Sequence, residues 1–241
     1  MQRIPSLAAV LAAALCAGSL SALSAAQEPR PIRPFNRQNL EGWTTKAPKE
    51  RSHWVVGRAT LDPADPSKLQ VEQATGRGAQ LVNATGGGVD IYSNEKWGDH
   101  TLEVEVMVPK GSNSGIYVAG EYEVQVLDSF GKEQVGPGDL GGIYGASAPK
   151  VNAAKAPGEW QKFVIDFKAP RFKGDRKVSN AKFLKVVLND QVIHENVEMK
   201  GPTPTGVSGK EAPTGPVMFQ GDHGAVAYRN LRITPRSFDG A

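Results

Sequence analysis

Glu121, Glu123 and Gln125 alternate with apolar residues in the segment EYEVQV, and this spacing suits acid–base chemistry. On an extended strand, residues two positions apart point to the same side and lie about 6.5 to 7 Å apart. Two neighbouring carboxylates can differ in pKa, so that one acts as an acid and the other as a base toward a sugar. The alternative is a solvated sheet face without a catalytic role, as we expect for Glu103 and Glu105.

Five further residues are candidates for the same site. His223, in the segment QGDHG, could shuttle protons near neutral pH, and Arg171 could fork onto a carbonyl or carboxylate. Asn113 and Asp90 lie beside glycine-rich turns and could bind hydroxyl groups, and Trp160 is our candidate among four tryptophans for stacking on a sugar ring. The respective alternatives are an exposed loop histidine, a surface ion pair, ordinary turn chemistry and burial in the core.

The segments that would position these residues alternate with a period of two, which predicts an all-β fold. Ten short strands separated by turns are typical of a β-sandwich. The expected strands cover residues 54–61, 90–93, 101–108, 115–119, 122–127, 161–167, 184–188, 192–196, 217–220 and 227–233.

The connections between these strands are of two kinds. Ala119-Gly120 and Asn189-Asp190 are short enough and of the right residue types for hairpin turns. The longer glycine- and proline-rich segments 131–156 and 201–215 exceed hairpin loops, and we expect them to lie outside the core and to border a binding site. Without a linker or a shift in composition, residues 27–241 are predicted to form a single domain.

The N-terminal 26 residues have the pattern of a secretory signal peptide. Arg3 is followed by the apolar run 7–17 and then by small residues, with a cut expected before Gln27. An anchored lipoprotein is disfavoured because Leu15 precedes Cys16. Since no later stretch approaches about 20 apolar residues, the mature protein is predicted to be periplasmic or secreted and free of the membrane.

Composition limits the classes of partner and cofactor. The net charge is only +3, and no basic stripe is visible in the sequence, so no nucleic-acid partner is expected. The chain lacks the histidine, cysteine and EF-hand spacings of metal sites, so no metal or cofactor is predicted, although a divalent ion in the loops stays open, as does the oligomeric state. The expected partner is a small carbohydrate.

Four long stretches together resemble the 3-keto-disaccharide hydrolase domain family. They are FNRQNLEGWT (35–44), GGGVDIYSNEKWGDHTLEVEVMVPKGSNSGIYVAGEYEVQVLDS (86–129), GGIYGASAPKVNAAKAPGEWQKFVIDFKAPRF (141–172) and GPVMFQGDHGAVAYRNLRI (215–233). The resemblance implies a concanavalin A-like jelly-roll β-sandwich of two antiparallel sheets. It also implies action on glycosides oxidised at C3 of the sugar, in a family that includes 3-keto-glucoside lyases and hydratases.

A ketone at C3 acidifies the proton on C2, which gives the glutamates a specific task. On this interpretation Glu123 is the principal base, and Glu121 or His223 protonates the leaving oxygen or delivers water. Arg171 and Gln125 would hold the keto oxygen and the neighbouring hydroxyls. A conventional glycosidase with two carboxyl groups, or a binding module without catalysis, are the alternatives.

Overall fold

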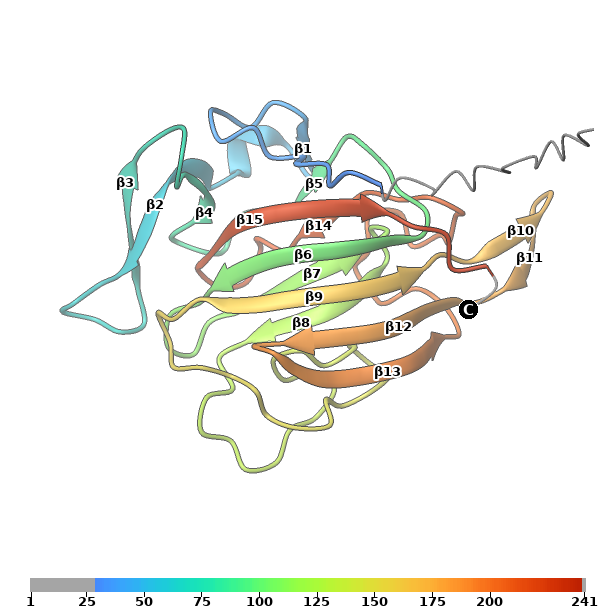
Figure 1. Cartoon of the computed structure of the whole chain (residues 1–241). Coiled ribbons are helices and arrows are strands. Elements are labelled where there is room, and N and C mark those ends of the chain that lie inside the picture. The colour runs from blue at the N-terminus through green and yellow to red at the C-terminus, as the bar shows by residue number, and fades with distance from the viewer. Residues whose placement is uncertain (1–28, 240–241) are drawn as a thin grey trace, which may run out of the picture.

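Two antiparallel β-sheets make up most of the protein, as the alternating sequence predicts. The computed structural model describes residues 29–239 (Figure 1). The predicted signal peptide, residues 1–26 with Cys16, lies outside the described residues. Within residues 29–239 no helix is long and apolar enough to cross a membrane. The elements are β1 (Trp43–Thr45), the 3-10 helix η1 (Lys49–Arg51), β2 (Trp54–Leu61), β3 (Leu69–Gln73), β4 (Gln80–Asn83), β5 (Ile91–Ser93), β6 (His100–Met107), β7 (Asn113–Val118), β8 (Tyr122–Leu127), β9 (Gln161–Lys168), β10 (Arg171–Lys173), β11 (Arg176–Ser179), β12 (Ala181–Leu188), β13 (Gln191–Met199), β14 (Met218–Phe219) and β15 (Val226–Pro235).

The larger sheet has eight strands in the order β13-β12-β9-β6-β15-β4-β2-β3, and the smaller has five in the order β1-β5-β14-β7-β8. In Figure 1 the central strands of the larger sheet lie in front of β7, β8 and β14, and the β10–β11 hairpin projects from one end. All strand pairs in both sheets are antiparallel. The predicted jelly-roll β-sandwich is confirmed.

The core lies between the two sheets and is formed by every second residue of each strand. Leu102, Val104 and Val106 of β6 are at most 1% exposed, and their neighbours Glu103 and Glu105 lie on the outer face. From the smaller sheet, Tyr122, Val124 and Val126 of β8 are buried in the same way. The rings of Tyr122 and Phe167 have their centroids 5.4 Å apart, so they join the two layers. Burial of each such large side chain contributes about 1.5–3 kcal/mol.

The two predicted hairpin turns have left-handed backbone geometry, which Gly120, Asn189 and Asp190 adopt readily and Ala119 does not. Ala119 and Gly120 have φ of 50° and 71°, and Asn189 and Asp190 have 49° and 66°. Two consecutive positive φ values are the mark of the tight turn that matches strand twist. Ala119-Gly120 thereby fixes the β7–β8 register that aligns the polar face of the smaller sheet.

The structure corrects the sequence analysis at several elements. Strands β1, β3, β4, β10 and β11 were not expected, and β3 exposes most of its residues. The expectation that segment 131–156 lies outside the core is wrong in part. Leu140 and Ile143 are 3% and 0% exposed, because Ile143 pairs with Val124 along the free edge of β8.

Candidate active site

A row of polar side chains crosses the face of the smaller sheet that points away from the core. The β7–β8 register places Tyr117 opposite Glu123 and Gly115 opposite Gln125. On the other side of β7, Met218 of β14 is aligned with Tyr117. Glu123 and Gln125 therefore share one face, as their alternation predicts.

This face is not the solvated surface that the sequence pattern suggested. Glu121, Glu123 and Gln125 are only 4%, 4% and 5% exposed. Thr203 bonds to the backbone at both Glu121 and Glu123, so that loop 201–215 runs along the sheet edge. The carboxyl group of Glu123 is therefore largely removed from water, and such burial changes the pKa of a carboxyl group.

Gly115 makes room for the carboxyl group of Glu123. A Cβ atom at position 115 would lie 2.3 Å from Oε1 and 3.1 Å from Cδ of Glu123. Since real Cβ contacts are never so close, any side chain at this position would displace the carboxyl group. The glycine in mid-strand, which weakens a strand, is explained by this close approach.

Burial raises the pKa of Glu123 from its usual 4.5 to about 7. A hydrogen bond from Tyr117 and the nearby His223 act in the opposite direction, whereas Asp90 and Asp222 add to the increase. Burial also raises the pKa of Tyr117, so its hydroxyl keeps its proton and can donate. A carboxyl group that is half ionised near neutral pH is well matched to proton transfer.

Lys46, which the sequence analysis did not single out, brings a positive charge to this face. Its Nζ lies 3.3 Å from Oδ2 of Asp90 and donates to the carbonyl of Thr205. The other carboxylate oxygen of Asp90 accepts a 3.0 Å hydrogen bond from Gly221 N. The Tyr117 hydroxyl lies 2.8 Å from Thr205 Oγ1, so Thr205 links Lys46 to Tyr117.

Three buried amide oxygens on this side of the molecule lack a hydrogen-bond partner in the described part of the chain. They are Oδ1 of Asn113 and Oε1 of Gln125 and Gln220. Gln220 N donates a hydrogen bond to the Gly115 carbonyl, and Gly115 is aligned with Gln125 on the next strand. The two glutamines therefore lie on either side of Gly115. An unpaired buried polar atom costs about 1–3 kcal/mol, and a sugar hydroxyl would supply the missing donor. Asn113 and Gln125 thus have oxygen atoms without a donor, and their roles in binding hydroxyls stay predictions.

His223 lies at the margin of the site. Its side chain is 49% exposed, and Nδ1 is 2.5 Å from Oδ1 of Asp222. Its charge affects the pKa of Glu123, which places it within electrostatic range of that carboxyl group. The structure thus brings together Glu123, Gln125, Asp90, Asn113 and His223 from the predicted set.

Glu121 does not join this group as a free carboxylate. Its Oε1 accepts hydrogen bonds from Ser208 N at 2.8 Å and Ser208 Oγ at 2.7 Å, and its Oε2 accepts one from Gly209 N at 2.9 Å. These contacts fix loop 201–215 to the start of β8. The role of proton donor that the sequence suggested for Glu121 is therefore corrected to that of a loop anchor.

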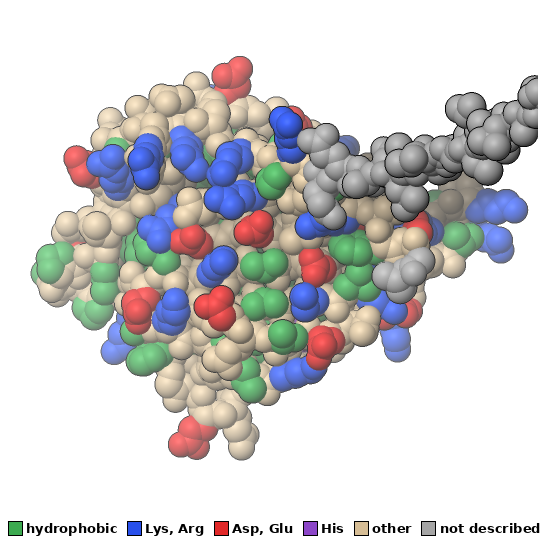
Figure 2. All heavy atoms as spheres, in the orientation of Figure 1, with side chains coloured by type: hydrophobic (Ala, Val, Ile, Leu, Met, Phe, Trp, Pro, Cys, Tyr) green, Lys and Arg blue, Asp and Glu red, His purple; other side chains and the backbone are tan. Residues whose placement is uncertain are grey.

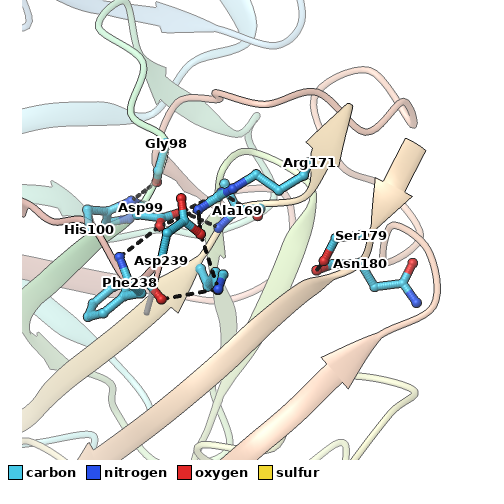
Figure 3. Close-up of polar contacts among 10 residues, drawn as sticks. Gly98, Asp99, His100, Ala169, Arg171, Ser179, Asn180, Phe238 and Asp239 are labelled. Carbon is cyan, nitrogen blue, oxygen red and sulfur yellow. Dashed lines mark hydrogen bonds and ion pairs between the residues drawn. The ribbon is translucent and has the colours of Figure 1, made fainter. Parts of the chain in front are cut away.

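Arg171 is committed to another network, and its predicted contact with the sugar is corrected (Figure 3). Its guanidinium donates to Asp99 Oδ1 and Oδ2 at 2.8 and 2.7 Å and to Asp239 at 2.9 Å. Asp99 also accepts from the backbone N–H groups of Ala169 and Phe238. Figure 3 shows this cluster where the end of β9 meets the C-terminal segment, and it ties that segment to the sheet.

The tryptophans do not provide the predicted sugar platform. The ring of Trp160 packs on the outer face of the larger sheet, near Met107 and Ala227, and the Arg229 guanidinium lies 3.9 Å from its centroid. Trp43, Trp54 and Trp97 are buried at 8% exposure or less, in a cluster with core residues. The proposed stacking role of Trp160 is thus corrected.

Tyr144 is an aromatic residue beside the site that the sequence analysis missed. Tyr144 N bonds to the Glu123 carbonyl at 3.1 Å, and the adjacent pair Ile143 and Val124 form a bridge. Because Ile143 faces the core, the alternation places Tyr144 on the same face as Glu123. Tyr144 is 42% exposed and, with Thr203 and Pro204, borders a hollow of about 380 Å³. The sequence analysis missed Tyr144 because it lies in a loop whose residues do not alternate between polar and apolar.

Comparison with known proteins places this chain in a family. The model of the 3-keto-alpha-glucoside-1,2-lyase-like domain matches residues 30–234, which is most of the chain. No curated protein matched. Among solved structures, two Parabacteroides distasonis proteins, each named as a putative glycosyl hydrolase, share the fold. One has a TM-score of 0.65 and 24% identity, with 86% of this chain and 84% of that chain covered. The other has a TM-score of 0.59 and 17% identity, with 86% and 94% covered. The chain belongs to the 3-keto-alpha-glucoside-1,2-lyase-like domain family and is a carbohydrate-active enzyme.

Proposed function

We propose that the protein cleaves glycosides that carry a ketone at C3, and that Glu123 removes the proton from C2. The observation that carries this proposal is the buried carboxyl group of Glu123, seated over Gly115 with a pKa of about 7. A base of that pKa can accept a proton near neutral pH and return it in a later step. The family match supports the substrate class.

The reaction begins when Glu123 takes the C2 proton and the electron pair of the C2–H bond moves onto the C3 oxygen as an enolate. The enolate then collapses and forms the C1–C2 double bond, and the C1–O bond breaks with its electrons on the leaving oxygen. That oxygen takes up a proton and departs as an alcohol. The products of this elimination are a 3-keto-2-hydroxy-glucal and the alcohol.

Hydration completes a net hydrolysis. Water adds its oxygen to C1 of the double bond, and C2 receives a proton, for which protonated Glu123 is the proposed source. The result is a free 3-keto sugar. No oxidant or reductant enters, because the ketone is present at the start and at the end.

The remaining polar groups are assigned to charge stabilisation and proton delivery. The Lys46 ammonium, held by Asp90 and Thr205, is assigned the role of stabilising negative charge on the enolate oxygen. The unpaired oxygens of Gln125 and Gln220 are suited to accept hydrogen bonds from sugar hydroxyls. His223, exposed and bonded to Asp222, is proposed to exchange the proton of the leaving oxygen with water.

A conventional glycosidase is less well supported by the same geometry. Such an enzyme needs two carboxyl groups on opposite sides of the scissile bond. Glu121 is bonded to Ser208 and Gly209, and Asp90 is bonded to Lys46 and Gly221. Neither of these carboxylates is free to act as a second catalytic group beside Glu123.

The test is an assay of the purified protein on a 3-keto-disaccharide and, in parallel, on the same disaccharide without oxidation. We expect enone absorbance and free sugar only from the oxidised substrate, and uptake of deuterium at C2 in heavy water. Glu123→Gln is expected to abolish both. Turnover of the unoxidised disaccharide alone would show a conventional glycosidase, and binding without turnover of either sugar would indicate a binding module.

A further inference from the structure

Five arginines surround a hollow on the outer face of the larger sheet, on the opposite layer from Glu123. The hollow has a volume of about 640 Å³. Its arginines are Arg33, Arg37, Arg77, Arg229 and Arg232. Figure 2 shows a row of Lys and Arg side chains across the upper left of this face. The sequence shows no basic stripe because these residues come from three distant segments of the chain.

The backbone holds these segments together. Ile32 pairs with Ile233 through hydrogen bonds of 2.7 and 2.9 Å. Arg33 directly follows Ile32, and Arg232 directly precedes Ile233, so this pairing brings the two arginines close together. Gly76 N donates to the carbonyl of Arg37 at 2.8 Å and joins the loop of Arg37 to that of Arg77. Arg37 has a φ of 63°, a conformation that costs a residue other than glycine about 1 kcal/mol or more. The arginines are thus gathered by fixed backbone contacts.

Within residues 29–239, four of the five arginines form no ion pair. Arg229 forms a 2.7 Å ion pair with Glu105. For Arg33, Arg37, Arg77 and Arg232, no carboxylate of residues 29–239 lies within ion-pairing distance. Like charges at close range repel one another, and a bound anion would relieve that repulsion. Guanidinium groups also match carboxylate and sulfate oxygens in a two-point geometry.

The surface next to this hollow identifies the kind of anion. A second hollow of about 170 Å³ shares Asn230 and Arg232 with the first and is lined by Glu103, Glu105 and Lys162. Glu103 can accept hydrogen bonds from the hydroxyl groups that every unit of a glycan carries, whereas the backbone of DNA and polyphosphate offer no such donors. No aromatic ring lines either hollow, so the stacking that binds single-stranded nucleic acids is not available.

We propose that the arginine groove, formed by the five arginines named above, binds an acidic polysaccharide. Carboxylate or sulfate groups lie among the arginines, and the hydroxyl groups of the same chain reach Glu103, whereas Glu105 is held by Arg229 and Asn230. The groove would hold the enzyme on an anionic glycan while the opposite sheet acts on its own substrate. Binding there does not depend on the chemistry proposed for Glu123.

The experiment measures binding of the full protein to polygalacturonate and to sulfated dextran, with neutral dextran, polyphosphate and duplex DNA as further ligands. We expect both acidic polysaccharides to bind, in a salt-dependent manner, and neutral dextran not to bind. The double variant Arg77→Glu/Arg232→Glu should lose at least tenfold in affinity. The two acidic polymers distinguish carboxylate from sulfate as the preferred group.

The matched control is Lys173→Glu/Arg176→Glu, which changes the net charge equally on the β10–β11 hairpin, away from the groove. It should retain affinity within about twofold, and both variants should give the circular dichroism spectrum of the parent. A second groove variant, Arg77→Lys/Arg232→Lys, keeps the charge and should lose part of the affinity. Equal losses in the groove and hairpin variants, or tighter binding of DNA or polyphosphate than of either polysaccharide, would overturn the proposal.

Discussion

The carboxyl group of Glu123 occupies the space that a side chain at position 115 would fill, with Oε1 only 2.3 Å from the place of a Cβ atom. The two residues are on neighbouring strands, and Gly115 is opposite Gln125, two residues from Glu123. The position of the proposed base is thus set by the absence of a side chain on the next strand.

Gly115→Ala should therefore displace the carboxyl group of Glu123 and lower kcat on a 3-keto-glycoside by at least about tenfold. The protein should still fold, because Gly115 has ordinary strand geometry, with no positive φ. Gly201→Ala is the matched control, since nothing lies within 4 Å of a Cβ at that position. Steady-state kinetics and thermal melting of both variants make the comparison. Parental kcat in Gly115→Ala would contradict the proposed placement.

The pKa of Glu123 predicts the pH dependence of the reaction. Because the base must be ionised, kcat/KM should rise with pH and level off above about 7. The hydrogen bond from Tyr117 lowers this pKa, so Tyr117→Phe should move the rise to higher pH. Profiles of kcat/KM against pH for the two proteins test this. A shift to lower pH, or none, would show that Tyr117 does not stabilise the ionised carboxyl group.

The same pKa predicts the effect of Glu123 on stability. The folded protein binds the proton more tightly than the unfolded chain, so the free energy of unfolding should fall as pH rises from about 4.5 to 7. Above pH 7 the penalty is nearly complete and is on the order of 3 kcal/mol. Glu123→Gln removes it and should be more stable than the parent at pH 8, with little difference at pH 4. Urea denaturation at both pH values measures this, and equal stability at pH 8 would argue against a buried charge.

Tyr144 is expected to contact the part of the substrate beyond the ketone-bearing sugar, because it is exposed on the same face as Glu123. Tyr144→Ala should raise KM severalfold for a 3-keto-disaccharide, since stacking on one ring contributes about 1 kcal/mol. Tyr144→Phe, which keeps the ring, should retain the parental KM. Phe130→Ala is the control for loss of an exposed aromatic residue. Equal KM values in Tyr144→Ala and the parent would exclude the contact.

Arg171 should matter for stability and not for catalysis. Arg171→Met leaves Asp99, whose side chain is 6% exposed, without its ion pair, and should cost about 1–3 kcal/mol of unfolding free energy. Its kcat and KM, measured well below the melting temperature, should equal those of the parent. A lower kcat with an unchanged melting temperature would instead indicate that Arg171 contributes to catalysis.

Alternation along each strand was sufficient to predict the β-sandwich and to assign Glu123 and Gln125 to one face. It could not predict their burial, because the loops that cover them make contacts distant in sequence, such as that of Thr203 with Glu123. Lys46 and Tyr144 escaped notice for the same reason, since neither lies in an alternating segment. Arg171 and Glu121 were misassigned because residue type alone does not show which groups a charged side chain contacts. Arg171 binds Asp99, and Glu121 binds Ser208 and Gly209.

The outer edge of β8 is covered by the loops that close the site. Its backbone groups bond to Thr203, Tyr144 and Gly142 instead of to another strand. An uncovered edge of this kind is a template on which a second chain can add a strand. These loops therefore protect the edge of β8 from pairing with another chain as well as covering Glu123. Variants with shorter loops, made to admit larger glycans, would leave backbone N–H and C=O groups of β8 unpaired at the edge of the sheet. Such variants would favour aggregation.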